Sequence, residues 1–330
     1  MEYRVLGRTR LQVSALGFGC GNVGGLMVRG APRERERAVA RAIELGINYF
    51  DTAPSYGDTL SEQHLGQALK TLKAQVYVGT KFRLAPEDLG DVRGAVARSL
   101  EASLRRLELE RVDLIQLHNL IARERHGDRL GMADVLEEVV PAMQALQAQG
   151  KARFIGITAL GETDALHRVI DAGVLDTTQV CFNLLNPTAG HAVPAGFPAQ
   201  DFGRLLDRAR AQWLGVIGIR VLAAGALSGV AVRHPIAVPS VEPIASGPDY
   251  ASDVGRARLL QPLVDEGHAE SLVEAALRFA LAADAPSTVL LGYSSLEHLE
   301  YAVASVAKGP LSRAALDRLT SLWSRLAAGA

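Results

Sequence analysis

The segment GINYFDTAPSYGDTLSEQHLGQAL, residues 46–69, contains a complete strand, turn and helix. The short apolar run within it ends directly on Asp51, and the turn that follows carries Tyr56. Ser61 and Glu62 then begin a helical pattern, in the manner of a cap and a first-turn carboxylate. A carboxylate at the carboxyl end of a buried strand needs an ion pair or hydrogen bonds to stay charged. Asp51 therefore marks a polar site beside the core.

The same strand-then-helix unit recurs along the whole chain. We predict strands at 15–18, 48–50, 76–79, 112–117, 154–157, 178–181, 214–219 and 288–291. We predict helices at 34–45, 61–72, 92–107, 134–149, 162–172, 202–211, 269–283 and 296–306. The strands are apolar on both faces, which is typical of a buried parallel sheet. Eight such units predict a (β/α)8 TIM barrel, formed by one domain spanning residues 1–330. An open Rossmann sheet is disfavoured because no strand is followed by a G-x-G-x-x-G turn.

Three segments lie outside these units. Residues 1–13 contain LGRTRLQVS, which predicts a β-hairpin at the bottom of the barrel. The connections at 184–200 and 223–255 are longer than a barrel requires and lack secondary structure in the sequence pattern, and we favour lids over disordered segments. Both follow a strand, so they lie on the C-terminal face, where barrel enzymes keep their active sites. The apolar residues of the second connection, which need a surface to cover, are Val230, Val232, Ile236 and Val238.

The composition of the chain excludes several functions. The formal net charge is -1 and no arginine-rich face stands out, so binding to nucleic acid or to an anionic membrane is not expected. No apolar run reaches the ~20 residues of a membrane helix, and the first residues lack the apolar centre of a signal peptide. Cys20 and Cys181 are too few for a disulfide framework. We therefore expect a soluble cytoplasmic protein.

Four polar residues stand at the exits of consecutive strands. Asp51 and Tyr56 follow one strand, VYVGTKF delivers Lys81 at the exit of the next, and VDLIQLHN delivers His118 after that. Adjacent strands are roughly 5 Å apart, so these side chains can converge on one site. Each residue alone has an ordinary structural role, such as an ion pair between Asp51 and Lys81. Their occurrence together, in this order, predicts a catalytic site.

The motifs FDTAPSYG, E-x-x-L-G-x-A-L, G-T-K and DLIQLH together resemble those of the aldo-keto reductase superfamily, and the likeness extends over nearly the whole chain. The resemblance implies a nicotinamide-dependent oxidoreductase with a catalytic tetrad of Asp51, Tyr56, Lys81 and His118. It implies that Tyr56 is the proton donor and acceptor. Carbonyl reduction develops negative charge on oxygen, and a phenol, with a pKa of about 10, needs an adjacent ammonium to be an effective acid. His118 would hydrogen-bond the substrate oxygen.

The resemblance also implies a cofactor site and no metal. GKARFIGIT, QVCFNLLNP, AAGALSG and LLGYSSLEHLE fall, in order, at the family's nicotinamide, substrate and phosphate elements. The cofactor-binding residues that it implies are Thr158, Gln179, Ile219, Arg220, Leu222, Gly225, Leu227, Gly292, Ser294, Ser295 and His298.

Several of these residues depart from the family pattern. Thr158 and Ala159 replace the usual Ser-Asn pair, whereas Gln179 keeps the glutamine that binds the carboxamide. Ile219 replaces an aromatic residue that stacks on the nicotinamide. Arg220 replaces a serine, and its guanidinium either binds the pyrophosphate or forms a salt bridge at the barrel rim.

The choice between NAD and NADP depends on the residues after the last strand. Members that prefer NADP carry lysine or arginine there, but residues 292–298 contain neither and include Glu297. The sequence therefore favours NAD. In the opposing interpretation, His298 or Arg220 reaches the extra phosphate, or the serines and helix amides suffice.

Three functions are compatible with these residues. The leading one is an oxidoreductase that acts on a small polar carbonyl or alcohol, such as an aldose, an aldehyde or a ketone. GYSSLEHLE is similar to the bacterial and plant sugar-dehydrogenase-like members of the family. The second is a nicotinamide-sensing regulatory subunit, because the family contains channel-associated members. The third is an aldolase that uses Lys81 in a Schiff base, which Asp51 argues against because such a lysine must be free of a carboxylate partner.

Overall fold

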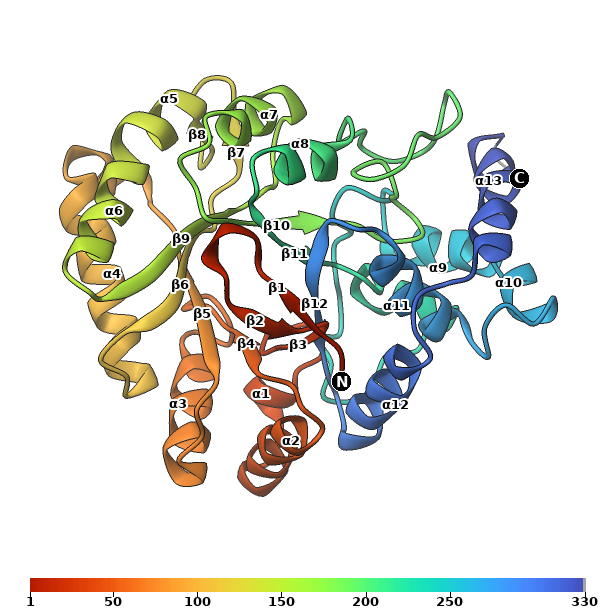
Figure 1. Cartoon of the computed structure of the whole chain (residues 1–330), viewed down its shortest axis with the longest axis horizontal. Coiled ribbons are helices and arrows are strands. Elements are labelled where there is room, and N and C mark those ends of the chain that lie inside the picture. The colour runs from red at the N-terminus through yellow and green to blue at the C-terminus, as the bar shows by residue number, and fades with distance from the viewer. Residues whose placement is uncertain (329–330) are drawn as a thin grey trace.

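The computed structural model describes residues 1–328 and shows a closed barrel of eight parallel strands (Figure 1). Its strands are β3 (Leu16–Gly19), β4 (Tyr49–Asp51), β5 (Tyr77–Phe82), β6 (Val112–Leu117), β9 (Ala152–Thr158), β10 (Thr177–Cys181), β11 (Gly215–Ile219) and β12 (Pro286–Gly292). Each strand pairs with the next in chain order, and the pairing of β12 with β3 closes the barrel. The predicted fold and all eight predicted strands are confirmed.

Helices surround the barrel and cover its outer face (Figure 1). The eight that match the predicted helices are α2 (Pro32–Glu44), α3 (Leu60–Leu72), α4 (Val92–Leu107), α6 (Val140–Ala148), α7 (Thr163–Asp171), α8 (Leu205–Ala211), α11 (Leu272–Ala282) and α12 (Leu296–Ala307). The helix predicted at 134–149 is irregular, since α5 (Met132–Asp134) and a π-helical turn (Val135–Val139) precede α6. Pro141, which has no backbone N–H to donate, accounts for this break in the helical hydrogen bonds.

The N-terminal hairpin closes the bottom of the barrel, as predicted. β1 (Tyr3–Val5) pairs antiparallel with β2 (Gln12–Ser14). The apolar residues of the hairpin and of the barrel floor form one buried cluster, made of Leu6, Leu11, Val13, Tyr49, Leu114, Ile217 and Leu290. This cluster keeps water out of the end of the barrel opposite the predicted site.

The 223–255 connection contains more structure than we predicted, whereas 184–200 has no helix or strand, as predicted. A 3-10 turn (Ala223–Ser228) begins the second connection, and α9 (Tyr250–Arg258) begins before its predicted end. The helices α1 (Leu26–Arg29), α10 (Pro262–Asp265) and α13 (Arg313–Ala327) were also not predicted. Trp323 of α13 donates its indole N–H to the carbonyl of Leu184 at 3.0 Å, so the C-terminal helix packs against the start of the 184–200 connection.

The 223–255 connection is fastened to the segment after β3 by arginines. Arg29 donates to the carbonyl of Ile236 at 2.7 Å, and Arg233 donates to the carbonyls of Ala224, after β11, at 2.8 Å and of Val23, after β3, at 3.3 Å. The expectation that its apolar residues cover a surface is wrong for Val230 and Val232, which are 52% and 85% exposed. Ile236 and Val238 are partly buried, and Ile236 packs against the core. Apolar contacts and hydrogen bonds to backbone carbonyls therefore both hold this segment in place.

Candidate active site

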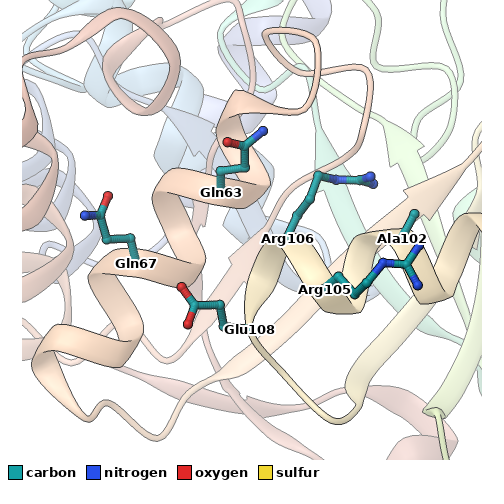
Figure 2. Close-up of a pocket in the computed structure, with 6 residues that line it drawn as sticks. All are labelled: Gln63, Gln67, Ala102, Arg105, Arg106 and Glu108. Carbon is teal, nitrogen blue, oxygen red and sulfur yellow. The ribbon is translucent and has the colours of Figure 1, made fainter.

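The open groove of Figure 2 is separate from the predicted site. It lies on the outside of the barrel between α3 and α4, and its lining residues are Gln63, Gln67, Ala102, Arg105, Arg106 and Glu108. None of these is a predicted site residue. The predicted residues lie instead at the carboxyl ends of the barrel strands.

A buried ion pair between Asp51 and Lys81 forms the base of the site. Asp51 ends β4, Lys81 lies near the end of the adjacent β5, and their exposed fractions are 3% and 1%. The Lys81 ammonium donates to the Asp51 carboxylate, to the Thr52 carbonyl at 2.9 Å and to the Tyr56 hydroxyl at 3.1 Å. Burial lowers the pKa of Lys81, but the Asp51 carboxylate and then Tyr56 raise it to a net value above normal. The side chain therefore remains an ammonium.

The second oxygen of Asp51 accepts three further hydrogen bonds. Its donors are the Tyr49 hydroxyl at 3.2 Å, the Gln116 amide at 3.2 Å and the Gln179 amide at 2.7 Å. Sequence reasoning missed Tyr49 and Gln116. Tyr49 lies two residues before Asp51 on β4, and Gln116 lies on β6 two residues before His118, which follows that strand; in an extended chain this spacing places side chains on one face. Together with Lys81, these donors compensate the charge of a carboxylate that water cannot reach.

Tyr56 and His118 stand above the ion pair, and both are only half-buried. Their rings are 6.1 Å apart at 85°, so the four predicted catalytic residues do converge. Burial, followed by the positive charges of Lys81 and Arg83, lowers the pKa of His118 to about 3. The imidazole is therefore neutral at physiological pH, with one N–H to donate.

Buried hydrogen bonds tie the segment that carries Tyr56 to the barrel. The predicted helix cap is wrong at Ser61, because α3 begins at Leu60 with Thr59 as its N-cap. The Ser61 hydroxyl donates instead to the carbonyl of Cys20 at 2.8 Å. Glu62 is in the first turn as expected, but it is fully buried and accepts from Thr80 and Arg106, both at 2.6 Å.

Thr158 and Gln179, the predicted carboxamide ligands, lie side by side on β9 and β10. The Thr158 hydroxyl donates to the Gln179 amide oxygen at 3.3 Å, while the Gln179 nitrogen is engaged by Asp51. The Gln179 oxygen therefore keeps one lone pair for a further N–H donor.

The predicted residues at and after β11 differ in accessibility. Ile219, Leu222 and Gly225 are partly exposed, so a ligand can contact them. Leu227 is fully buried in the core, so its side chain is not accessible to a ligand.

Arg220 follows β11 directly and has no acidic partner within residues 1–328. The alternative that it forms a salt bridge at the rim is therefore wrong. Its Nη1 atom is buried without any hydrogen-bond partner in the described part of the chain. Burial lowers the pKa of Arg220, and the charge of Arg233 contributes in the same direction.

The residues predicted to contact the cofactor phosphate lie after β12. Gly292 is exposed, but the Ser294 hydroxyl donates to the carbonyl of Gly24 at 2.7 Å. Ser295 is the N-cap of α12 and accepts from the backbone N–H of His298 at 3.3 Å. The His298 ring lies 5.6 Å from that of His234, on the fastened connection. Burial, followed by His234, lowers the pKa of His298.

Two negative findings apply to residues 1–328. Their His, Cys, Asp and Glu side chains form no group that could hold a metal ion, and none of their helices is long and apolar enough to cross a membrane.

A closed parallel barrel with an ion-paired lysine beside a half-buried tyrosine and histidine defines an oxidoreductase of the aldo-keto reductase type. The chain belongs to the aldo/keto reductase family, whose model matches residues 15–324. It is similar to L-galactose dehydrogenase of Arabidopsis thaliana, with 33% identity over 312 residues that cover 93% of this chain and 88% of the relative. D-threo-aldose 1-dehydrogenase of a Pseudomonas species is 33% identical over 217 residues, covering 56% of this chain and 62% of the relative.

A solved structure shares the fold across the full barrel. The holo form of aldo-keto reductase AKR11C1 from Bacillus halodurans superposes with a TM-score of 0.72 and 24% identity. The match covers 99% of this chain and 96% of that one. At this identity the likeness concerns the fold alone.

Proposed function

We propose that this protein is an NAD(P)-dependent oxidoreductase that transfers a hydride between nicotinamide and a small polar carbonyl or alcohol, such as an aldose, an aldehyde or a ketone. The observation that carries the proposal is the Lys81 ammonium, which bridges the buried Asp51 carboxylate and the Tyr56 hydroxyl. The names of the two sugar dehydrogenases among the relatives support a sugar substrate. We also propose that residues 1–330 form one catalytic domain and that the enzyme is cytoplasmic.

Tyr56 is the proton donor in this proposal. Its oxygen accepts a hydrogen bond from Lys81, so its own O–H remains free to donate to the substrate oxygen. The adjacent ammonium stabilises the phenolate that forms when the proton leaves. The neutral His118 imidazole donates a second hydrogen bond to the same oxygen and fixes its angle. In the oxidative direction the phenolate takes the proton from the alcohol.

The residues at the ends of β9 to β12 fit a nicotinamide dinucleotide. They offer a free lone pair on Gln179 for the carboxamide, the apolar Ile219 for the ring and an unpartnered guanidinium, Arg220, for an anionic group. When bound, the cofactor would supply or accept the hydride. The fastened 223–255 connection would lie over it.

NAD is the preferred cofactor in this proposal. The Ser294 hydroxyl already donates within the protein, the Ser295 hydroxyl keeps a neutral O–H, and residues 292–298 contain no lysine or arginine. A ribose phosphate would therefore lack charge-assisted hydrogen bonds worth roughly 1.5–3 kcal/mol each. The Glu297 carboxylate adds repulsion.

The Schiff-base alternative finds no support at Lys81. All three ammonium hydrogens have acceptors and the net pKa is raised, whereas an aldolase lysine must lose its proton to attack a carbonyl.

Tyr56→Phe tests the proposal. Removal of the hydroxyl is expected to lower kcat by roughly 10²- to 10⁴-fold, the usual contribution of a general acid. The Kd for NADH should stay within about twofold, because the ring and its position are kept. Absorbance of the reduced nicotinamide with a panel of aldoses, aldehydes and ketones measures turnover in both directions. Near-wild-type turnover in the variant would remove Tyr56 as the proton donor.

A further inference from the structure

Arg220 combines three unusual features in one residue. Its backbone has a φ of 57°, in the left-handed region that residues with a side chain enter only at a free-energy cost. Its guanidinium atom Nη1 is buried without a hydrogen-bond partner within residues 1–328. The titratable groups near its guanidinium are Cys181, Tyr56 and Arg233, and Tyr56 places it at the mouth of the candidate active site.

A buried asparagine holds Arg220 in this strained conformation. The Asn183 amide nitrogen donates to the Arg220 carbonyl at 2.9 Å, and Asn183 itself is fully buried. The Asn183 side-chain oxygen accepts the backbone N–H groups of Leu185 and Asn186, both at 2.9 Å. This network fixes the backbone of Arg220, from which the guanidinium extends.

The surroundings of the reaction centre are positive. Arg220 follows β11 and is close to Arg233. Arg83 follows β5, and its charge lowers the pKa of His118. None of these three arginines forms a salt bridge with a described residue, while the charge of Lys81 is cancelled by Asp51. A buried guanidinium without an anion is costly, and unpaired cations around a cleft concentrate anions in it.

We propose that Arg220 is the centre of an oxyanion-binding site at the barrel mouth, which takes a phosphate or carboxylate group through the planar donors of its guanidinium. This inference rests on the proposed function, because the group belongs either to the pyrophosphate of the cofactor or to an anionic substituent of the carbonyl substrate. Both sources present an oxyanion to the guanidinium. A change at Arg220 would alter the affinity for NADH in the first case and the preference for charged substrates in the second.

Arg220→Gln tests the site, with Arg220→Lys as the variant that keeps the charge but loses the planar fork. Arg105→Gln is the matched control, because Arg105 is an exposed arginine without a salt bridge in the outer groove of Figure 2. Calorimetry measures the affinity of each protein for inorganic pyrophosphate and for NADH. Initial rates measure kcat/KM for two matched pairs: glyceraldehyde with glyceraldehyde 3-phosphate, and butanal with succinic semialdehyde.

Loss of a charge-assisted hydrogen bond is expected to cost about ten- to a hundredfold in the affected quantity. A loss in NADH affinity, with both members of each pair affected equally, identifies the cofactor as the source. A loss confined to the charged member of each pair identifies the substrate. Arg220→Gln should also unfold at a higher urea concentration than wild type without ligand, since it removes an unpaired, partly buried charge whose Nη1 atom has no hydrogen-bond partner within residues 1–328.

Changes below about twofold in every affinity and in every substrate ratio would overturn the site. The pyrophosphate titration does not depend on turnover. If the wild-type enzyme reduced none of the carbonyls, the proposed function would fail, while the response of pyrophosphate binding to Arg220→Gln would still decide the oxyanion site.

Discussion

Lys81→Met separates the structural contribution of the buried ion pair from its contribution to chemistry. The substitution leaves the Asp51 carboxylate 3% exposed, with one oxygen unpaired. Breaking a buried pair costs ~3–5 kcal/mol. We expect the lower end, because Tyr49, Gln116 and Gln179 still donate to the other oxygen. A 330-residue chain has an unfolding entropy of about 0.7 kcal/mol per kelvin, so Tm should fall by about 4 °C.

The double variant Asp51→Asn/Lys81→Met removes both charges and supplies the matched control. It should recover most of the lost free energy of unfolding, because no uncompensated charge remains in the barrel. It should not recover activity, since Tyr56 still lacks its ammonium neighbour. Urea unfolding of the wild type, the two single variants and the double variant gives the coupling energy, and nicotinamide absorbance gives kcat. A double variant less stable than Lys81→Met, or an active one, would contradict this account.

Three further outcomes follow from the geometry. In the folded protein the pKa of His118 is about 3, whereas an unfolded histidine takes up a proton below about pH 6.5. The free energy of unfolding of the wild type should therefore fall by about 1.4 kcal/mol per pH unit, relative to His118→Gln, as the pH falls from 6 to 4. Hydrogen exchange of residues 223–255 should slow when NADH binds; unchanged exchange would remove the lid role. Calorimetry at one ionic strength should show NADH binding at least tenfold tighter than NADPH above pH 7, and the reverse order would overturn the cofactor choice.

The barrel was predictable because each of its strands is a short run of apolar residues. Such runs are buried on both faces in a parallel barrel, and polar residues directly after them lie at the mouth by topology alone. For this reason Asp51, Lys81 and His118 could be placed together from the sequence. Tyr49 and Gln116 were missed, because the two-residue spacing places them on the same face as a site residue but does not show that both donate to the Asp51 carboxylate.

Residues whose role depends on the absence or presence of a partner were the hardest to predict. From the sequence, a pyrophosphate contact and a salt bridge were equally well supported at Arg220. Only the folded chain shows that no carboxylate forms a salt bridge with it within residues 1–328. Ser61 has the residue type of a helix cap, yet its hydroxyl donates to the carbonyl of Cys20, which follows the neighbouring strand β3. Local propensity was outweighed in both cases by contacts between distant segments.

The hydrogen bonds of the site form one continuous chain from β9 to the turn that carries Tyr56. The Thr158 hydroxyl donates to Gln179, Gln179 donates to Asp51, and Lys81 donates to both Asp51 and Tyr56. The first two residues are the proposed carboxamide ligands and the last is the proposed proton donor. A donor that binds the free lone pair of Gln179 polarises its amide and strengthens its hydrogen bond to Asp51. The same carboxylate holds the ammonium beside Tyr56, so the cofactor end and the proton end of the site share one buried charge.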